Sequence, residues 1–315
     1  MEMPARRVFA DPKVDLAFKV LFGREATRSL AICLLNAVLD LPEGQQIVEL
    51  ELLNPFNPQE TLDDKLIILD VKVRDQTGRY YNIEMQMLPF PCFSQRILFY
   101  WSQMYQEQLQ SGDSYTELRP TVSISFLNYE LFQDEPRSHL RFRLLEVEGQ
   151  YPLTADIDIH ILQLRKFCKT AAELATLSDC WLYFLCHAET MNVDDLPLLM
   201  QRSEFQLAFE TLHMLTQSGT EKQLYDARRK AQLDYNTAIS ESHREGLEKG
   251  VEEGLEKGIE KGIEKGRREE KAEIVRKFQR RLHQTPTSTD TLLQKTLGEL
   301  ERLEAELEKL LFPEG

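Results

Sequence analysis

The sequence predicts an α/β fold in which helices cover a mixed sheet. Helical and strand-like segments follow one another in the order helix, strand, strand, strand, helix, strand, which is typical of a layered α/β structure. The chain has 315 residues, of which 42% are hydrophobic, so it can bury a core of one large or two ordinary domains. After about residue 169 the strand patterns stop. We therefore expect a helical subdomain and then a long helical C-terminal tail.

The first predicted elements are helical. Over residues 14–39 apolar side chains recur at three- and four-residue spacing with a break near Gly23, which predicts one or two helices. Strand-like runs follow at residues 47–53, 62–74 and 79–88. The last two runs flank the turn-forming sequence Asp75-Gln76-Thr77-Gly78, so we expect one strand followed by a hairpin.

The next segments complete the sheet and begin the helical part. Residues 93–109 carry a helical apolar face that ends at Ser111 and Gly112, and residues 120–127 form the next predicted strand. Strand-like stretches at residues 139–146 and 157–164 extend the sheet. Helical patterns at residues 171–177, 181–188 and 205–215 predict the subdomain.

From residue 241 a four-residue repeat sets the tail apart. Glycines recur from Gly246 to Gly266, and an aliphatic residue follows each of the first five. Both stripes drift about 40° per repeat around a helix. Each helical glycine costs about 1 kcal/mol, so this helix is marginal unless something packs against it. The aliphatic residues are Leu247, Val251, Leu255, Ile259 and Ile263.

Beyond Pro286 the leucines fit about two and a half heptads of a coiled-coil pattern. Two interpretations of the tail remain open: it associates with a second copy to give a homo-oligomer, or it is a solvated charged segment. We expect three segments, an α/β domain at 1–168, the helical subdomain at 169–240 and the tail at 241–315.

Charge and cysteine usage restrict the partners and the compartment. The 52 acidic residues outnumber the 38 lysines and arginines, giving a net charge of −14, so any nucleic acid must be held locally rather than by bulk charge. Five cysteines without a CxxC pair indicate reduced thiols in the cytoplasm. The N-terminus lacks an apolar signal region, and no run of about 18 apolar residues occurs, so we expect neither secretion nor membrane insertion.

Two carboxylates on the predicted hairpin carry the strongest chemical signal. Strand alternation places Asp70 and Lys72 on one polar face, and Glu84 and Gln86 on the polar face of the next strand. A five-residue loop would set Asp70 directly opposite Glu84, and a three-residue loop would leave them diagonal. Their Cβ atoms then lie about 5–8 Å apart, close enough to share a cation such as Mg²⁺, with Mn²⁺ as a substitute. A plain ion pair of Asp70 with Lys72 is the alternative.

One set of motifs stands out along the chain: residues 15–22 (DLAFKVLF), 69–71 (LDV), 81–86 (YNIEMQ), Arg96 with Tyr100, and 112–115 (GDSY). Together these motifs resemble the Rpn family of recombination-promoting nucleases and transposases, within the PD-(D/E)XK nuclease superfamily. The resemblance covers about residues 10–165 and implies an αβββαβ restriction-endonuclease-like core. It also implies a Mg²⁺-dependent DNA endonuclease, acting in recombination or transposition, with Asp70 and Glu84 as metal-binding acids.

In this resemblance Gln86 occupies the usual lysine position. A glutamine can orient a water molecule but brings no positive charge. A replacement cation would come from Lys19, our first choice because it lies in a matching motif, or from Lys65 or Lys72 on the hairpin. For Lys19 the alternative is a surface i,i+4 pair with Asp15, which lies four residues earlier.

Arg96 and Tyr100 lie one helical turn apart after the hairpin. They are candidates for phosphate contact or for bracing the acids, with ordinary helix packing as the alternative. Two rival functions remain. One is a nuclease-like protein that has lost catalysis and serves as an interaction or assembly module through its tail, and the other is hydrolysis of RNA or another phosphodiester. The six histidines show no metal-binding spacing, so we expect them to be ordinary surface or core residues.

Overall fold

The computed structural model describes residues 8–54, 70–217 and 219–312; within these ranges the side chains of Asp70 and His243 are not described. The chain divides into two compact units, Met1–Asn236 and Thr237–Gly315. Each unit is considered by itself below. The predicted strand at residues 62–74 lies partly outside the described residues, because the described strand begins at Asp70.

The first unit is built on one mixed sheet, which among the described residues has six strands in the order β1-β2-β3-β4-β6-β5. Neighbours β1, β2 and β3 are antiparallel, β4 runs parallel to both β3 and β6, and β5 closes the edge antiparallel to β6. The predicted α/β class with a mixed sheet is confirmed. The bounds are β1 Leu50–Leu52, β2 Asp70–Asp75, β3 Tyr80–Gln86, β4 Thr121–Leu127, β5 His139–Arg143 and β6 Ile157–Gln163.

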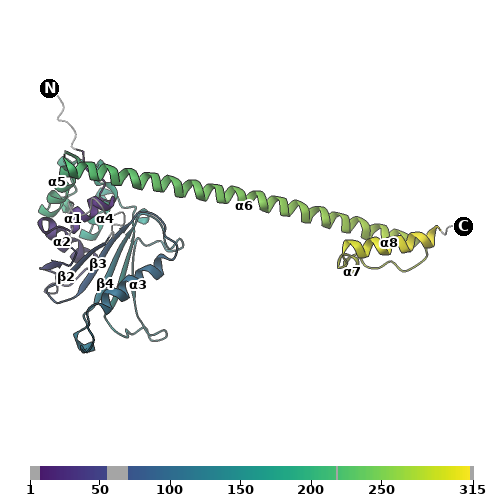
Figure 1. The fold of residues 1–315 in the computed structure, drawn as a ribbon, viewed down its shortest axis with the longest axis horizontal. Coiled ribbons are helices and arrows are strands. Elements are labelled where there is room, and N and C mark those ends of the chain that lie inside the picture. Colours follow the sequence, from purple (N-terminus) through teal and green to yellow (C-terminus); the bar gives the residue numbers. More distant parts are fainter. Residues whose placement is uncertain (1–7, 55–69, 218, 313–315) are drawn as a thin grey trace, which may run out of the picture. The chain divides into compact units, whose positions relative to one another are not determined.

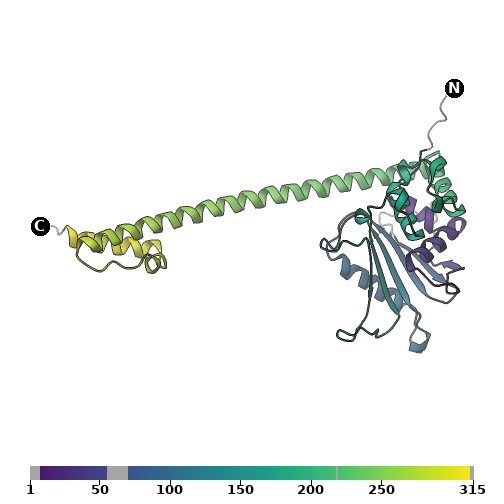
Figure 2. The same cartoon turned by 180° about the vertical axis from the view of Figure 1, so that it is seen from behind.

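Helices cover both faces of this sheet (Figure 1; Figure 2 from behind). One face carries α1 (Asp15–Phe22), α2 (Arg28–Leu39), α4 (Leu177–His187) and α5 (Ser203–Gln217), and the other carries α3 (Phe93–Gln106). The predicted break after α1 is a 3-10 turn over Glu25–Thr27, where the Thr27 hydroxyl donates a hydrogen bond to the Val20 carbonyl at 2.9 Å. The arrangement is thus a helix–sheet–helix sandwich.

Strand alternation decides which residues enter the larger core. Tyr81, Ile83 and Met85 of β3 pack with α1, α2, α4 and α5, and Val122, Ile124 and Phe126 of β4 do the same. Each fully buried large apolar side chain contributes about 1.5–3 kcal/mol. Residues 169–236 share this core with the sheet and with α1 and α2. The three-part division of the chain proposed from the sequence therefore stays a prediction.

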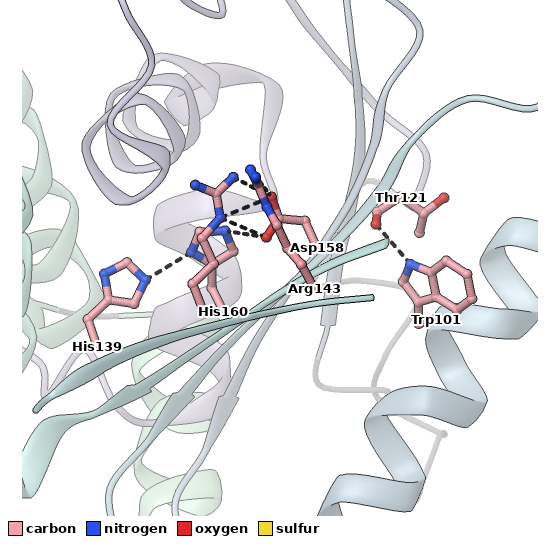
Figure 3. Close-up of polar contacts among 7 residues, drawn as sticks. Trp101, Thr121, His139, Arg143, Asp158 and His160 are labelled. Atoms are coloured by element: carbon pink, nitrogen blue, oxygen red, sulfur yellow. Dashed lines mark hydrogen bonds and ion pairs between the residues drawn. The ribbon is translucent and has the colours of Figure 1, made fainter. Parts of the chain in front are cut away.

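A smaller core and one hydrogen bond hold α3 over the other face. Phe93 and Ile97 of α3 pack on residues of β4 and β6. The indole Nε1 of Trp101 donates a hydrogen bond to the Thr121 carbonyl at 2.8 Å, shown in Figure 3, and the Trp101 ring stacks on Tyr105 at 5.0 Å. These contacts position α3 above the polar row of β3 and β4.

One predicted helix is shorter than its pattern indicated. The segment 171–177 forms only a 3-10 turn over Ala171–Glu173. Thr176 has an extended backbone, and its side chain accepts a hydrogen bond from the Asp179 amide in a capping box, so α4 begins at Leu177. The N-terminal cap therefore overrides the apolar pattern in this segment.

The second unit is helical. It contains the C-terminal part of α6 (Thr220–Arg281), then α7 (Thr289–Leu293) and α8 (Leu297–Leu311). The glycine repeat is helical throughout, and α6 starts well before residue 241 because residues 221–240 contain neither glycine nor proline. The heptad leucines other than the exposed Leu310 pack with α6 of the same chain, around a small core of Ala272, Val275, Leu292, Leu300 and Leu307. No helix in the described part of the chain is both long and apolar enough to cross a membrane.

Candidate active site

The β2–β3 hairpin has the register that sets the two predicted acids opposite each other. Arg74 pairs with Tyr80 and Asp70 pairs with Glu84, so the loop comprises residues 75–79, the five-residue alternative. Because the Asp70 side chain is outside the described part of the chain, a cation shared by the two acids stays a prediction.

The turn of this hairpin is closed by Asp75. Its carboxylate accepts hydrogen bonds from the Thr77 amide at 2.8 Å, the Arg79 amide at 3.1 Å and the Tyr81 hydroxyl at 2.7 Å. Gly78 has a φ of +85°, a backbone conformation that favours glycine. The turn sequence thus determines the register on which the pairing of residues 70 and 84 depends.

Glu84 is a buried carboxylate between β3 and α3. Its side chain lies beneath α3 with the residue 6% exposed, and Oε1 accepts a hydrogen bond from the Ser125 hydroxyl at 2.7 Å. Ser125 is the partner of Glu84 in the parallel β3–β4 ladder. Oε2 lies 3.6 Å from Nη2 of Arg96 on α3. A buried charge needs such compensation, because desolvation strongly disfavours an unpaired carboxylate.

Aromatic rings hold the Arg96 guanidinium in place. Its Cζ atom lies 5.0 Å from the centre of the Phe90 ring, 5.8 Å from that of Phe93 and 5.6 Å from that of Tyr100. Its Nε is buried and has no hydrogen-bond partner among the described residues. Arg96 and Tyr100, which the sequence singled out one turn apart, therefore meet beside Glu84.

Tyr129 is a neighbour of this site that the sequence analysis missed. Its ring packs against Phe93 at 6.2 Å. Burial raises the pKa of the Tyr129 hydroxyl, and the nearby negative charge of Glu84 raises it further, so the phenol stays protonated. Ser125 was also missed, although alternation in residues 121–127 would have placed it on the polar face. For Tyr129 the sequence offered no comparable signal.

Gln86 lies at the end of β3, beside a cleft of about 250 Å³. Its Nε2 donates a hydrogen bond to the Leu88 carbonyl at 3.1 Å, and its Oε1 is buried and accepts no hydrogen bond from the described residues. Asp15 of α1 and Arg228 of α6 also line the cleft. Arg228 forms no ion pair with the described residues. It lies far from Gln86 in the sequence, so the sequence could not indicate that the two line one cleft.

The predicted cations lie in different parts of the first unit. Lys19 is in α1, on the face of the sheet opposite α3, and is only 8% exposed, which argues against the surface pair with Asp15. Lys72 of β2 is half-buried and pairs with Asn82 across the ladder. Lys65 lies outside the described residues. The catalytic or binding roles of Lys19 and Lys72 stay predictions.

The donor atoms near Glu84 fit a hard divalent cation. Along the polar face of β3, Glu84 stands between Asn82 and Gln86 in the strand sequence, and the side-chain amide oxygen of each is buried and accepts no hydrogen bond from the described residues. Carboxylate and amide oxygens suit Mg²⁺ and Mn²⁺, and Asp70 stands across the ladder. Within the described ranges no three or more His, Cys, Asp or Glu residues form a group that could hold a metal ion.

A second polar cluster lies on the other face of the sheet, between β5 and β6. His139 and His160 share a hydrogen bond of 2.9 Å, and His160 lies 3.3 Å from Asp158 (Figure 3). Arg141 donates two hydrogen bonds from Nε to Asp158, at 2.9 and 3.1 Å. Burial opposes ionisation of Asp158, but the bonds from Arg141 and His160 outweigh it and hold the pKa of this carboxyl below its usual value. These contacts tie the edge strand β5 to β6.

Comparison with known proteins gives one match. A family model described as PD-(D/E)XK nuclease family transposase matches residues 12–242, a range that includes the whole sheet, α1 to α5 and the first part of α6. No curated protein and no solved structure matched the chain. The resemblance to the superfamily is confirmed by this match. The narrower assignment to the Rpn family stays a prediction.

Proposed function

Because the chain belongs to the PD-(D/E)XK nuclease family of transposases, we propose that it is a divalent-metal-dependent endonuclease that hydrolyses phosphodiester bonds of DNA in transposition or recombination. One observation carries the proposal. The buried carboxylate of Glu84 lies opposite position 70 in the β2–β3 ladder and is flanked by the guanidinium of Arg96. Acids, amide oxygens and one cation on a single face suit phosphodiester chemistry.

The proposed roles follow from position and donor type. Asp70 and Glu84 hold the ion, preferably Mg²⁺. When bound, such an ion lowers the pKa of water and offsets charge on the phosphate. Gln86 orients the attacking water through its amide. Lys19 of α1 lies on the opposite face of the sheet from Glu84, so its positive charge acts only at long range and not by contact with the phosphate. Arg96, Tyr100 and Lys72 bind the phosphate backbone on either side of the acids.

The acidic composition is compatible with this proposal if the DNA is held locally. The net charge of −14 opposes binding through the whole surface. Arg96 and Lys72 are cations on the two elements that flank Glu84, and Arg228 lines the adjoining cleft. We expect DNA binding to weaken as the salt concentration rises, with a shallow slope that reflects only a few phosphate contacts.

Plasmid cleavage tests the proposal directly. Supercoiled DNA is incubated with the full chain and Mg²⁺, with Mn²⁺, and with a chelator. We expect nicked or linear product only with metal. We expect the cleavage rate to fall by at least about 100-fold in Glu84→Gln and in Asp70→Asn, because both changes remove a charged ligand and keep the side-chain volume.

Glu51→Gln is the matched control, because Glu51 is an exposed acid on the neighbouring strand β1 that pairs only with Arg74 among the described contacts. This variant should cleave normally. Cleavage that survives both Glu84→Gln and Asp70→Asn would refute the site. A parallel RNA substrate separates deoxyribonuclease from ribonuclease activity.

A second candidate is a nuclease-like protein without catalysis. Two features favour it: a glutamine stands in the lysine position, and Arg96 already partly neutralises Glu84. Metal titration followed by calorimetry separates the two candidates. An inactive protein that also fails to bind Mn²⁺ would support the interaction role, whereas Mn²⁺ binding that Glu84→Gln abolishes supports the nuclease.

A further inference from the structure

The repeat of α6 exposes a row of large aliphatic side chains. Leu247, Val251, Leu255, Ile259 and Ile263 are each between 53% and 65% exposed, four residues apart on one helix. A row of five such residues on a charged helix is costly in water and marks a contact surface. The row lies wholly within the second unit.

A groove runs beside this row. Each aliphatic residue follows a glycine, and a Cβ atom built on any glycine from Gly246 to Gly266 would meet no atom within 4 Å. The open space beside these glycines is therefore not filled by packing within one chain. These glycines also weaken the helix by about 1 kcal/mol each relative to alanine, a cost that close approach of a partner helix would offset.

Charged residues complete the four-residue pattern. Glutamate follows the aliphatic residue in every repeat, at positions 248, 252, 256, 260 and 264, and lysine follows in four of the five, with Glu253 as the exception. At 100° per residue, the order around the helix is lysine, glycine, aliphatic, glutamate. The two charged rows rule out burial of this helix in the interior of a membrane.

This order is complementary to itself in only one orientation of a symmetric pair. When two copies run parallel about a twofold axis, the aliphatic row of each faces the glycine row of the other, and the glutamate row of each lies on the same side as the lysine row of the other. When they run antiparallel, aliphatic faces aliphatic, glycine faces glycine, and like charges lie on the same side. Packing and charge therefore both select the parallel pair.

The two ends of the surface are also defined. From Ala272 onward α6 is covered by α7 and α8 of its own chain, so the exposed row stops after Ile263 and Gly266. The rows drift about 40° per repeat, because a period of four exceeds 3.6 residues per turn. Helices that keep such rows in contact wrap around each other in the right-handed sense.

We propose that residues 246–266 of two copies of this chain form a parallel, right-handed helical pair, in which each aliphatic row packs into the glycine groove of the partner copy. The partner is a second copy of the chain, because this one helix surface carries both the aliphatic row and the glycine groove that receives it, together with both charged rows. The glycine repeat is then a dimerisation element, independent of any nuclease activity.

Sedimentation equilibrium of the full chain tests the pairing. We expect twice the chain mass, and at least about tenfold weaker association for Leu255→Lys. Leu310→Lys is the matched control, because Leu310 of α8 is 62% exposed against 65% for Leu255 but lies outside the row. Lysine forms helices nearly as well as leucine, and circular dichroism checks that helix content is kept.

A glycine variant tests the groove. Gly254→Gln combined with Gly258→Gln improves the intrinsic helix propensity, so an isolated helix would become more stable. In the proposed pair these side chains fill the groove, and we expect the mass to fall to that of one chain. An unchanged dimer in this variant would overturn the close packing.

Spin labels test the orientation. Glu245→Cys and Glu256→Cys are made separately, with Cys92, Cys168 and Cys186 replaced by serine. In the parallel pair both labels give short distances between copies. In an antiparallel pair centred on residue 256, the label at 245 would lie about 33 Å from its partner. That result would refute the parallel arrangement, and a monomeric full chain, or equal disruption by Leu310→Lys, would refute the surface.

Discussion

Arg96 on α3 and Glu84 on β3 form an ion pair between the helix layer and the sheet, with Nη2 and Oε2 3.6 Å apart. The guanidinium is held by three aromatic rings rather than by a second carboxylate among the described contacts. Glu84 therefore has a cationic neighbour at one oxygen and the Ser125 hydroxyl at the other. This arrangement keeps a charged acid in a buried place, at the site proposed for the metal.

Replacement of Arg96 tests the pair. Arg96→Gln leaves a buried carboxylate with less compensation, so we expect the free energy of unfolding to fall by about 1–3 kcal/mol, measured by urea denaturation. Arg96→Lys keeps the positive charge but loses the planar stacking on the aromatic rings. Its unfolding free energy should therefore lie between those of the parent protein and Arg96→Gln. Arg202→Gln, which removes an exposed partner of Glu204, should have little effect. Equal loss in both glutamine variants would argue against a special role of the Arg96 pair.

Ser125 also contacts the Glu84 carboxylate. Ser125→Ala removes the hydrogen bond from this hydroxyl to the buried Oε1, and we expect a loss of about 1–2 kcal/mol in unfolding free energy together with altered Mn²⁺ affinity. Ser123→Ala is the comparison, because Ser123 is on the same face of β4 but pairs with Asn82 in the ladder. If the two variants behave alike in Mn²⁺ titrations, the hydroxyl of Ser125 does not support the metal site.

Position 86 tests the proposed reaction. Gln86→Lys introduces a cation two residues from Glu84 on the same strand face, where it would offset charge that develops on the phosphate. We expect plasmid cleavage to be roughly tenfold faster at saturating Mg²⁺. Gln232→Lys, a change on the α6 side of the same cleft, controls for general attraction of DNA. Equal acceleration by both changes would point to DNA binding rather than to a role of residue 86 in the reaction.

The lowered pKa of His139 predicts that the stability of the fold depends on pH. Burial and the neighbouring His160 lower its pKa from 6.5 to about 4. Between pH 6.5 and 4 the unfolded chain thus binds a proton that the folded chain does not, so stability is greatest above this window and falls as the pH falls. Since the ring is partly exposed, we expect its share to be of the order of 1 kcal/mol, or about 2–4 °C in Tm.

The measurement is Tm by circular dichroism from pH 7 to pH 4.5. His139→Asn should flatten the decline, and the remaining slope includes His187, whose pKa is also lowered by burial. Asp158 affects stability at a lower pH than His139 does. The pKa of its carboxyl is lowered from the ordinary value of 3.8, so its ionised form stabilises the fold above pH 3.8. This stabilisation is lost as the pH falls below 3.8. A variant whose slope equals that of the parent would show that His139 does not titrate in this window.

Local patterns in the sequence predicted the sheet hairpin and restricted its register. Apolar and polar residues alternate on both strands, so the sequence left two loop lengths open, and the structure has the one that pairs position 70 directly with Glu84. The helical pattern before Gly23 and the repeat from Gly246 were equally readable. In each case the period of a single element carries the information.

Contacts between distant segments could not be read this way. Nothing local predicts that Tyr129 packs beside Glu84, or that Arg228 of α6 lines the cleft at Gln86. The heptad leucines left open whether the final helix has a partner, and they did not indicate that α8 packs on α6 of the same chain. The periodicity of a chain determines which side of an element is buried. Which surfaces then meet depends on how the shapes and charges of segments far apart fit once the elements have packed.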